Sequence, residues 1–175
     1  MNLLLKIQNV ISTANLQQYI DATKFNKFSW GRYDLQLYGG RCGYIKNEGM
    51  QGRVSVFLSG KMISTGAKSV SMSIWQLQHA MYLLVRNRLS GRVNLECKVQ
   101  NIVATHDLRR GLNVKKVLSS LSNYIYEPDS FPGIIYKSNR GTSCLLFSSG
   151  KVVIAGAKSE NQLNDTVKQI NKIVE

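Results

Sequence analysis

Hydrophobic and polar residues alternate along the chain in a pattern that occurs twice. FLSGKMISTGAKS spans residues 57–69 and FSSGKVVIAGAKS spans residues 147–159, so equivalent positions lie 90 residues apart. In each copy, two strand-like runs flank a Ser-Gly turn, which predicts a β-hairpin. Ser69 and Ser159 follow the hairpins and are expected to be the N-caps of helices. The chain is therefore interpreted as two related halves.

Apolar residues recur at helical spacing after each hairpin, so each half is expected to end in a long amphipathic helix. Shorter helices are expected at residues 19–28 and 114–121, after strands at 6–13 and 98–105. Helices of this kind cover one face of an antiparallel sheet and leave the other face open for binding. The expected buried positions of the long helices are Val70, Ile74, Leu77, Met81 and Leu84 in the first half, and Leu163, Val167, Ile170 and Val174 in the second.

The chain is strongly basic. Its 175 residues include 23 Lys and Arg and 10 Asp and Glu, which gives a formal charge of +13 and a pI of about 9.9. Such a surface attracts a polyanion, and nucleic acid is the leading candidate. Cys42, Cys97 and Cys144 form no CxxC pair, so neither a disulfide framework nor a zinc site is expected, and a reducing intracellular compartment fits.

Membrane proteins and enzymes are disfavoured by the remaining patterns. The first six residues lack the apolar core of a signal peptide. The uncharged run 69–85 is a poor membrane span because it contains Gln76 and His79, and its apolar stripe suits a core-facing helix. The carboxylates show no paired spacing, His79 and His106 have no metal-like neighbours, and no phosphate-cradling P-loop motif occurs. We expect no catalytic activity, no cofactor, no metal and no membrane partner.

Three segments match one known family. Gln-Asn-Ile-Val at residues 100–103, Tyr-Glu-Pro-x-x-Phe-Pro-Gly-x-Ile-Tyr-Lys at 126–137 and Leu-Leu-Phe-Ser-Ser-Gly-Lys-Val-Val-x-x-Gly-Ala-Lys-Ser at 145–159 resemble the core of the TATA-box-binding protein family. The resemblance covers nearly the whole chain. It is close in the second half and weaker between residues 16 and 53 of the first.

The resemblance implies an α+β fold with a pseudo-twofold tandem repeat. The family has a saddle shape, with a curved ten-stranded antiparallel sheet and four helices on its convex face. The first repeat is expected at residues 1–91 and the second at 92–175. No extension is expected before the first repeat, which would resemble an archaeal or minimal form. The expected location is the archaeal cytoplasm or nucleoid, or the nucleus if the host is eukaryotic.

The resemblance also implies a general transcription initiation factor. Members of this family bind the minor groove of A·T-rich promoter DNA and bend it with aromatic wedges. The family is itself the established example of this mechanism. They then assemble with transcription factor B and, indirectly, with the RNA polymerase machinery. The wedges match Phe131 and Phe147 in the second half and Phe57 and Tyr38 in the first. Because the Tyr38 hydroxyl needs a partner, a weaker kink is expected at the first-repeat end.

Further DNA contacts of the family carry over position by position. Asn9 and Asn101 would lie near the pseudo-dyad and donate to A N3 and T O2, whereas a G·C pair adds an amino donor there. Apolar contact with the groove floor is expected from Ile11, Val103, Ile63, Val153, Thr65 and Leu145. Phosphate contacts are expected from Lys61, Lys68, Lys151, Lys158, Arg53, Lys137 and Arg140.

Two loops match the stirrups of the family, and the second stirrup recruits transcription factor B. Members usually have Leu where Ser130 stands, so loss of this apolar anchor is expected to redistribute the contact. The stirrup residues are Glu127, Asp129 and Ser130 in the second repeat, and Asp34 and Leu37 in the first. Departures from symmetry are Ser55 opposite Leu145 and Ala155 opposite Thr65.

Two other hypotheses remain open. A divergent paralogue would act as a regulator or architectural DNA-binding protein without recruiting factor B. A protein of the same fold would serve as a platform for RNA or a hybrid duplex within a larger enzyme, although the near-complete second-repeat motif argues against this. The features that favour the divergent paralogue are Tyr38, Ser55, Ser130 and the long Gly-rich first loop.

Overall fold

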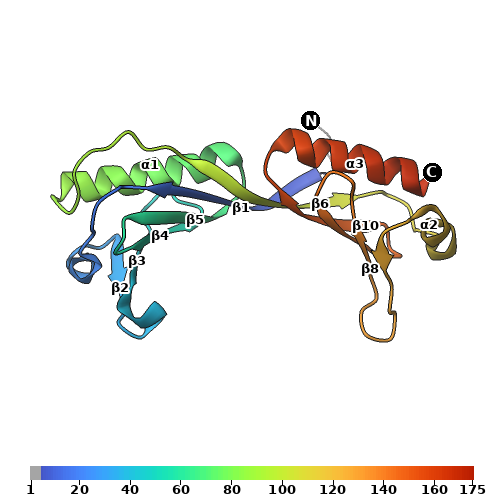
Figure 1. The fold of residues 1–175 in the computed structure, drawn as a ribbon, viewed down its shortest axis with the longest axis horizontal. Helices are drawn as coiled ribbons and strands as arrows, with labels where there is room; N and C mark the ends of the chain where they lie inside the picture. The colour runs from blue at the N-terminus through green and yellow to red at the C-terminus, as the bar shows by residue number, and fades with distance from the viewer. Residues whose placement is uncertain (1–4) are drawn as a thin grey trace. The chain divides into compact units, whose positions relative to one another are not determined.

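The computed structural model describes residues 5–175, so the expectation about a signal peptide falls largely outside the described residues. The elements in chain order (Figure 1) are β1 (Leu5–Asn15), η1 (Ala22–Lys27), β2 (Gly31–Tyr33), η2 (Leu37–Gly40), β3 (Cys42–Ile45), β4 (Arg53–Phe57), β5 (Lys61–Ala67), α1 (Val70–Arg86), β6 (Lys98–Asp107), α2 (Val114–Ser120), β7 (Tyr124–Ile125), β8 (Ile134–Lys137), β9 (Ser143–Leu146), β10 (Lys151–Ala157) and α3 (Glu160–Val174).

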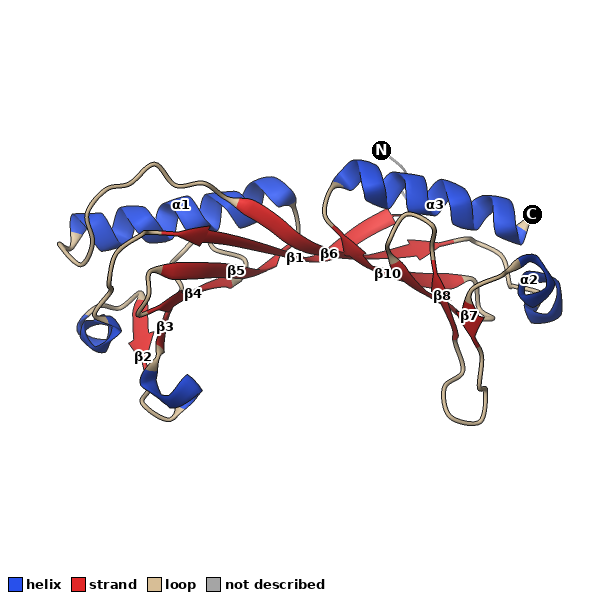
Figure 2. Ribbon diagram, in the orientation of Figure 1, coloured by secondary structure: helices blue, strands red, loops and turns tan. Residues whose placement is uncertain are grey.

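The described strands form one ten-stranded sheet in the order β2-β3-β4-β5-β1-β6-β10-β9-β8-β7. The order in one half mirrors the order in the other, as the sequence repeat requires. Helix α1 packs on β4 and β5, and α3 packs on β10 (Figure 2). The expected fold class is confirmed, with η1, α1, α2 and α3 as the four expected helices and η2 as an additional short 3-10 turn among the described residues. The helix expected at residues 19–28 is the short 3-10 helix η1.

The chain divides into two compact units that differ slightly from the sequence repeats. One unit is Asn9–Gln100, and the other combines the start of β1 with Asn101–Glu175. Within the second unit, the Gln8 amide donates to the Thr105 hydroxyl at 2.9 Å. Within the first, the Gln100 amide donates to the Thr13 hydroxyl at 2.8 Å. Each unit therefore contains a piece of the other half's central strand.

Side-chain caps fix the starts of both long helices. The Ser69 hydroxyl accepts a hydrogen bond from the Met72 N–H, and the Ser159 hydroxyl accepts one from the Gln162 N–H, each at 3.1 Å. A cap of this kind stabilises a helix by about 1 kcal/mol because it pairs an otherwise unsatisfied N–H group. The predicted caps are confirmed.

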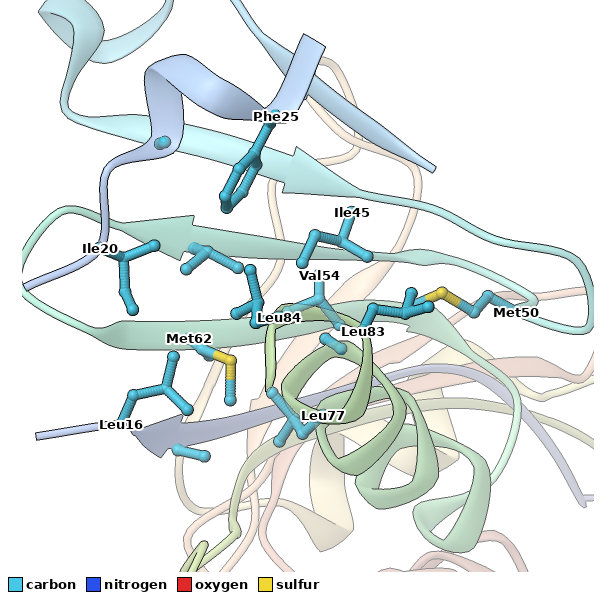
Figure 3. Close-up of a cluster of buried hydrophobic side chains, with 14 residues drawn as sticks. Leu16, Ile20, Phe25, Ile45, Met50, Val54, Met62, Leu77, Leu83 and Leu84 are labelled. Atoms are coloured by element: carbon cyan, nitrogen blue, oxygen red, sulfur yellow. The ribbon is translucent and has the colours of Figure 1, made fainter. Parts of the chain in front are cut away.

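A core in the first half lies between α1 and the strands (Figure 3). Leu77 and Leu84 point from α1 toward Met62 on β5, and all three are fully buried. Burying a side chain of this size contributes about 1.5–3 kcal/mol. In the second half, the predicted stripe of α3 is confirmed, since Leu163, Val167, Ile170 and Val174 are all buried.

The predicted stripe of α1 is confirmed at three of its five positions, since Leu77 and Leu84 are buried and Met81 packs against the core. Val70 and Ile74 are only partly buried, whereas the polar residues Ser73 and Gln76 have no exposed surface. Hydrophobic spacing could not reveal this orientation, because it is determined by a buried polar network.

Gln76 lies at the centre of that network. Its Oε1 accepts from the Gly52 N–H at 2.8 Å, and its Nε2 donates to the Ser64 hydroxyl at 2.7 Å. The Ser73 hydroxyl donates to Ser12 at 2.9 Å. Buried polar groups need such partners, so the network determines which face of α1 meets the sheet.

Substitution of Gln76→Ala is expected to lower the free energy of unfolding by about 3 kcal/mol, because the Gly52 N–H and the Ser64 hydroxyl lose their buried partner. Urea unfolding monitored by circular dichroism measures the change. The control is Gln78→Ala on the exposed side of the same helix, with an expected change within about 0.5 kcal/mol. Equal stabilities of the two variants would contradict the assigned role of the network.

Candidate nucleic-acid interface

Each half presents a strand face that no helix covers. On β10, Val152 and Ile154 are fully buried, whereas Val153 and Ala155 alternate with them and are partly exposed. Neighbouring side chains on a strand point to opposite faces, so the partly exposed set lies away from α3. All six residues predicted for the groove floor are partly exposed members of such sets: Ile11, Ile63, Thr65, Val103, Leu145 and Val153.

The two predicted asparagines are held identically in the two halves. Asn9 Oδ1 accepts from the Gly66 N–H, and Asn101 Oδ1 accepts from the Gly156 N–H, each at 2.8 Å. Both glycines have left-handed φ values, 86° and 94°, and lie where the strand ladders shift register. Each side chain therefore satisfies an N–H group at a bulge. Because the amide oxygen accepts this bond, the Nδ2 group is the part of each amide that is left to donate to a ligand.

Paired rings lie at the loop end of the open face in each half. The ring centroids of Tyr38 and Phe57 are 6.2 Å apart with an interplanar angle of 66°. Those of Phe131 and Phe147 are 5.8 Å apart with an angle of 65°. The three phenylalanines are only partly buried, and Tyr38 is 67% exposed. The structure thus brings the four predicted wedge residues together as two equivalent edge-to-face pairs.

A glycine supports the second pair. A Cβ on Gly133 would lie 2.7 Å from a ring carbon of Phe131 and 3.0 Å from one of Phe147. Any other residue there would displace one of the rings. Tyr38 is positioned differently, since its own backbone is left-handed with φ of 50°, a strained conformation for tyrosine. The first ring pair is therefore less well supported than the second.

A hollow lies beside each ring pair. Phe147 and Lys151 line one of about 780 Å³, and Phe57 and Lys61 line one of about 790 Å³. The lining residues are repeat equivalents. Each hollow thus combines an aromatic edge with a cation, which suits a sugar-phosphate backbone.

The predicted phosphate-binding residues are exposed on strand ends and turns. Lys61 and Lys151 begin β5 and β10, and Lys158 follows β10. Within residues 5–175, none of these three has a carboxylate partner, because the ion pairs there join Lys24 to Asp21 and Lys168 to Asp165. The remaining candidates, Lys68, Lys137, Arg140 and Arg53, are also exposed.

Arg53 has a contact that sequence reasoning missed. Its guanidinium lies 4.4 Å from the ring centroid of Tyr44, which pairs across the sheet with Ser55. In the second half, the corresponding cross-strand pair is Ile135 with Leu145. The predicted groove floor of the first half therefore carries a cation over an aromatic ring, whereas the floor of the second half is aliphatic at this position. Only the β3–β4 register shows this, and no local sequence signal could have shown it.

The stirrups are exposed turns. In the second, the Glu127 carbonyl accepts from the N–H groups of Ser130 and Phe131, at 3.0 and 2.8 Å. Glu127, Asp129 and Ser130 are all exposed, as are Asp34 and Leu37 in the first. Sequence reasoning missed two apolar residues beside these turns, Ile125 at 58% exposed and Leu35 at 70%. These two residues could have been found only from their exposure, which the sequence does not show.

The described part of the chain contains neither a metal-binding cluster nor a thiol with a lowered pKa. No group of three or more His, Cys, Asp or Glu side chains there could hold a metal ion. Burial raises the pKa of the Cys144 thiol to about 11, so it stays protonated and unreactive. Across residues 5–175, no helix is both long and apolar enough to cross a bilayer.

Open strand faces, exposed cations and paired rings, repeated in both halves, define a class: proteins that contact a nucleic-acid duplex through strands rather than through a recognition helix. The family model described as transcription factor TFIID, or TATA-binding protein, matches residues 4–86 and 96–175. The chain belongs to the TATA-binding protein family, whose members are promoter-binding transcription factors and not enzymes.

Archaeal proteins supply the similar sequences and structure. The TATA-box-binding protein of Cenarchaeum symbiosum is 49% identical over 158 residues, which cover 90% of this chain and 87% of that protein. That of Aeropyrum pernix is 34% identical over 173 residues, covering 94% and 81%. The TBP structure from Methanococcus jannaschii has a TM-score of 0.83 at 28% identity and covers 97% of both chains. The predicted family, of archaeal type, is confirmed.

Substitution of Asn9→Asp or Asn101→Asp is expected to weaken binding to an A·T-rich duplex by about 10-fold or more. The carboxylate still accepts from the glycine N–H group, but the outward donor is lost. Fluorescence anisotropy at fixed salt measures the affinity, and thermal unfolding checks the fold. Asn164→Asp on exposed α3 makes the same charge change and is expected to bind normally. Equal affinities of the three variants would remove the asparagines from the interface.

Proposed function

We propose that this protein is a general transcription initiation factor that binds the minor groove of A·T-rich promoter DNA, bends it and recruits a transcription factor B. The observation that carries the proposal is the repeated arrangement of an aromatic ring pair and an outward amide donor on the same open strand face. Family membership supports promoter binding, and the positions of these side chains support the groove and the distortion.

Base preference follows from the chemistry of the open face. A·T pairs present only acceptors in the minor groove, and the outward Nδ2 groups of Asn9 and Asn101 supply donors. G·C pairs add an amino group, which would meet apolar side chains such as Ile63 and Val153. An unpaired donor buried there costs about 1–3 kcal/mol, so A·T pairs are preferred.

Bending follows from the rings. Partly exposed aromatic edges such as those of Phe131 and Phe147 can enter a base step, where contact with the bases partly replaces the lost stacking. The Tyr38 hydroxyl has no hydrogen-bond partner among the described residues, and insertion would remove it from water. The first-repeat end is therefore proposed to give the weaker kink.

Affinity is supplied mainly by phosphate contacts. Each neutralised phosphate steepens the dependence of log K on log salt by about 0.9. Lys61 and Lys151 each line a hollow beside a ring. A duplex backbone lying in these hollows would be held on both sides of each inserted ring.

Recruitment of factor B is assigned to the second-repeat stirrup. Glu127 and Asp129 supply negative charge on an exposed turn. Ser130 supplies no apolar anchor of the kind in which interface energy is usually concentrated. The contact with factor B is therefore proposed to depend on the two carboxylates of this turn.

The double substitution Phe131→Ala and Phe147→Ala is expected to remove the second-repeat kink in an A·T-rich duplex and to leave only the weaker first-repeat kink, because no apolar edge remains to enter the base step at the second-repeat end. Fluorescence energy transfer between dyes at the duplex ends measures the bend. The matched variant Tyr38→Phe is expected to change the affinity for the duplex in the opposite direction. It should tighten binding by about 5-fold or more, because it removes an unpaired hydroxyl. A bend angle equal to that of the unmodified protein would reject the wedge assignment of Phe131 and Phe147.

Factor B recruitment is tested by a gel shift with A·T-rich promoter DNA and an archaeal transcription factor B. A supershifted ternary complex is expected, and Glu127→Ala with Asp129→Ala is expected to weaken it while binary DNA binding is unchanged. Asn139→Ser on the exposed turn between β8 and β9 is the control. A binary complex with no supershift would instead support a regulator or architectural protein, which the exposed Ser130 favours.

A further inference from the structure

The open strand faces of the two halves differ in chemistry at one cross-strand pair beside the ring pairs. In the first half, Tyr44 on β3 lies opposite Ser55 on β4. In the second half, Ile135 on β8 lies opposite Leu145 on β9. Ser55 and Leu145 are repeat equivalents, 90 residues apart, and each stands two residues before a ring-pair phenylalanine. We name each cross-strand pair the outer floor of its half.

Strand alternation places the first outer floor on the open face. Val54 and Val56 on β4 are fully buried, whereas Ser55 between them is partly exposed and Arg53 is exposed. Arg53 also pairs across the sheet with Thr65, which is a predicted groove-floor residue. Side chains that alternate with a buried set point to the opposite face. A hydroxyl and a guanidinium therefore lie on the face that is proposed to meet bases.

The second outer floor is aliphatic and offers no hydrogen-bond acceptor. Ile135 and Leu145 are both partly exposed on the open face. In the minor groove, a G·C pair differs from an A·T pair by the protruding 2-amino group of guanine. Against Ile135 and Leu145 this group would lose water without gaining a partner, which is unfavourable. The second half should therefore reject G·C at the base pair that faces Leu145.

The first outer floor has an acceptor at the same place. Ser55 is shorter than leucine, and its hydroxyl oxygen has lone pairs that can accept from the 2-amino group. The neighbouring Cys42 thiol interacts with this hydroxyl as a hydrogen-bond acceptor, which leaves the serine oxygen available. Arg53 lies with its guanidinium 4.4 Å from the Tyr44 ring centroid, so the ring is covered by a polar group. A guanine at this position would thus meet a polar surface with an acceptor.

The contrast is confined to one position in each half. Ser143 takes the place of Arg53 in the second half and is exposed, so a hydroxyl is present one position further from the rings there. Ile63 and Val153 keep the neighbouring strands β5 and β10 apolar in both halves. A difference in base preference is therefore expected only at the base pair that faces Ser55 or Leu145.

The energy of DNA deformation favours the same asymmetry. A·T steps, above all TA, are easily kinked, so a strong kink selects them without any base contact. The first ring pair contains Tyr38, whose backbone is left-handed, and is proposed to give the weaker kink. A weaker kink places a smaller demand on the flexibility of the step. A stiffer G·C-containing step is therefore less costly at the first-repeat end.

We propose that Ser55 is a specificity-determining residue: it lets the first half accept a G·C pair beside its ring pair, where Leu145 restricts the second half to A·T. This inference rests on the proposed minor-groove function and specifies its substrate further. The preferred duplex is A·T-rich with one end that tolerates G·C. Because such a duplex is asymmetric, its sequence also favours one orientation of the bound protein.

The test uses the full chain and a set of duplexes related to one A·T-only parent, with affinity measured by fluorescence anisotropy at fixed salt. One G·C pair is moved stepwise inward from one end, and in a second series a G·C pair is placed symmetrically at both ends. At the sensitive position, the one-ended duplex is expected to bind within about 2-fold of the parent, because the protein can place its first half there. The two-ended duplex is expected to bind about 10-fold or more weakly.

Modified bases isolate the amino group. An inosine·C pair lacks the 2-amino group and presents an A·T-like minor groove, so the two-ended inosine duplex is expected to bind like the parent. A 2,6-diaminopurine·T pair adds the amino group to an A·T-like pair and is expected to behave like G·C. These two pairs separate the contact with Ser55 or Leu145 from effects of the major groove.

Exchange of the two side chains tests the assignment in both directions. With Ser55→Leu, the loss of affinity caused by one G·C end, relative to the parent, is expected to rise from about 2-fold to about 10-fold. With Leu145→Ser, the loss caused by two G·C ends is expected to fall to a few-fold. Ser119→Leu on exposed α2 makes the same exchange away from the strands and should leave both ratios unchanged. Thermal unfolding checks that each variant is folded.

Each contrary result has a distinct meaning. Equal losses per G·C pair in the one-ended and two-ended duplexes would overturn the proposal, as would ratios that Ser55→Leu does not change. A loss that persists with inosine·C would assign the preference to DNA stiffness and remove Ser55 from it. Failure of the A·T-only parent to bind more tightly than a G·C-only duplex would overturn the proposed function itself. Tight binding of the parent with symmetric losses would overturn only the present inference.

Discussion

Burial of one sheet face beneath a long helix is the interaction on which each half depends. Leu77 and Leu84 from α1 and Leu163 and Ile170 from α3 are almost fully buried, and each contributes about 1.5–3 kcal/mol. Because side chains alternate on a strand, burying one set forces the other set outward. A slip of one residue would exchange the two faces, so the burial that stabilises the fold also specifies which residues can meet DNA.

The two bulges connect this constraint to recognition. At each, a left-handed glycine leaves an N–H group without a ladder partner, and the amide oxygen of Asn9 or Asn101 accepts from it. One hydrogen bond therefore satisfies the backbone at the bulge and holds the amide oxygen in place, which leaves the Nδ2 group as the remaining donor. The structural and the proposed functional roles of each asparagine cannot be separated by deleting the side chain, whereas replacement with aspartate retains the first and removes the second.

Duplication supplied the architecture, and later divergence made the halves unequal. The second half keeps a ring pair supported by Gly133 and an aliphatic floor, whereas the first has Tyr38 with φ of 50° and Arg53 over Tyr44. The helices differ as well, since α3 carries the ion pair of Asp165 and Lys168 where α1 carries the stacked rings of Trp75 and His79. These inequalities make the two halves of a symmetric scaffold chemically different.

The sequence alone determined the repeat, the hairpins, the helix caps, the buried stripe of α3 and the family. All of these are local or periodic features, or they depend on matches between positions 90 residues apart. Tertiary structure decided the face of α1 that is buried, because buried Gln76 and Ser73 bond to strands far away in the chain. It also decided the contact of Arg53 with Tyr44, the exposure of Ile125 and the stacking of Trp75 on His79. Contacts of this kind depend on strand register and helix rotation, which follow from the packing of the whole half and leave no mark in the local pattern of residues.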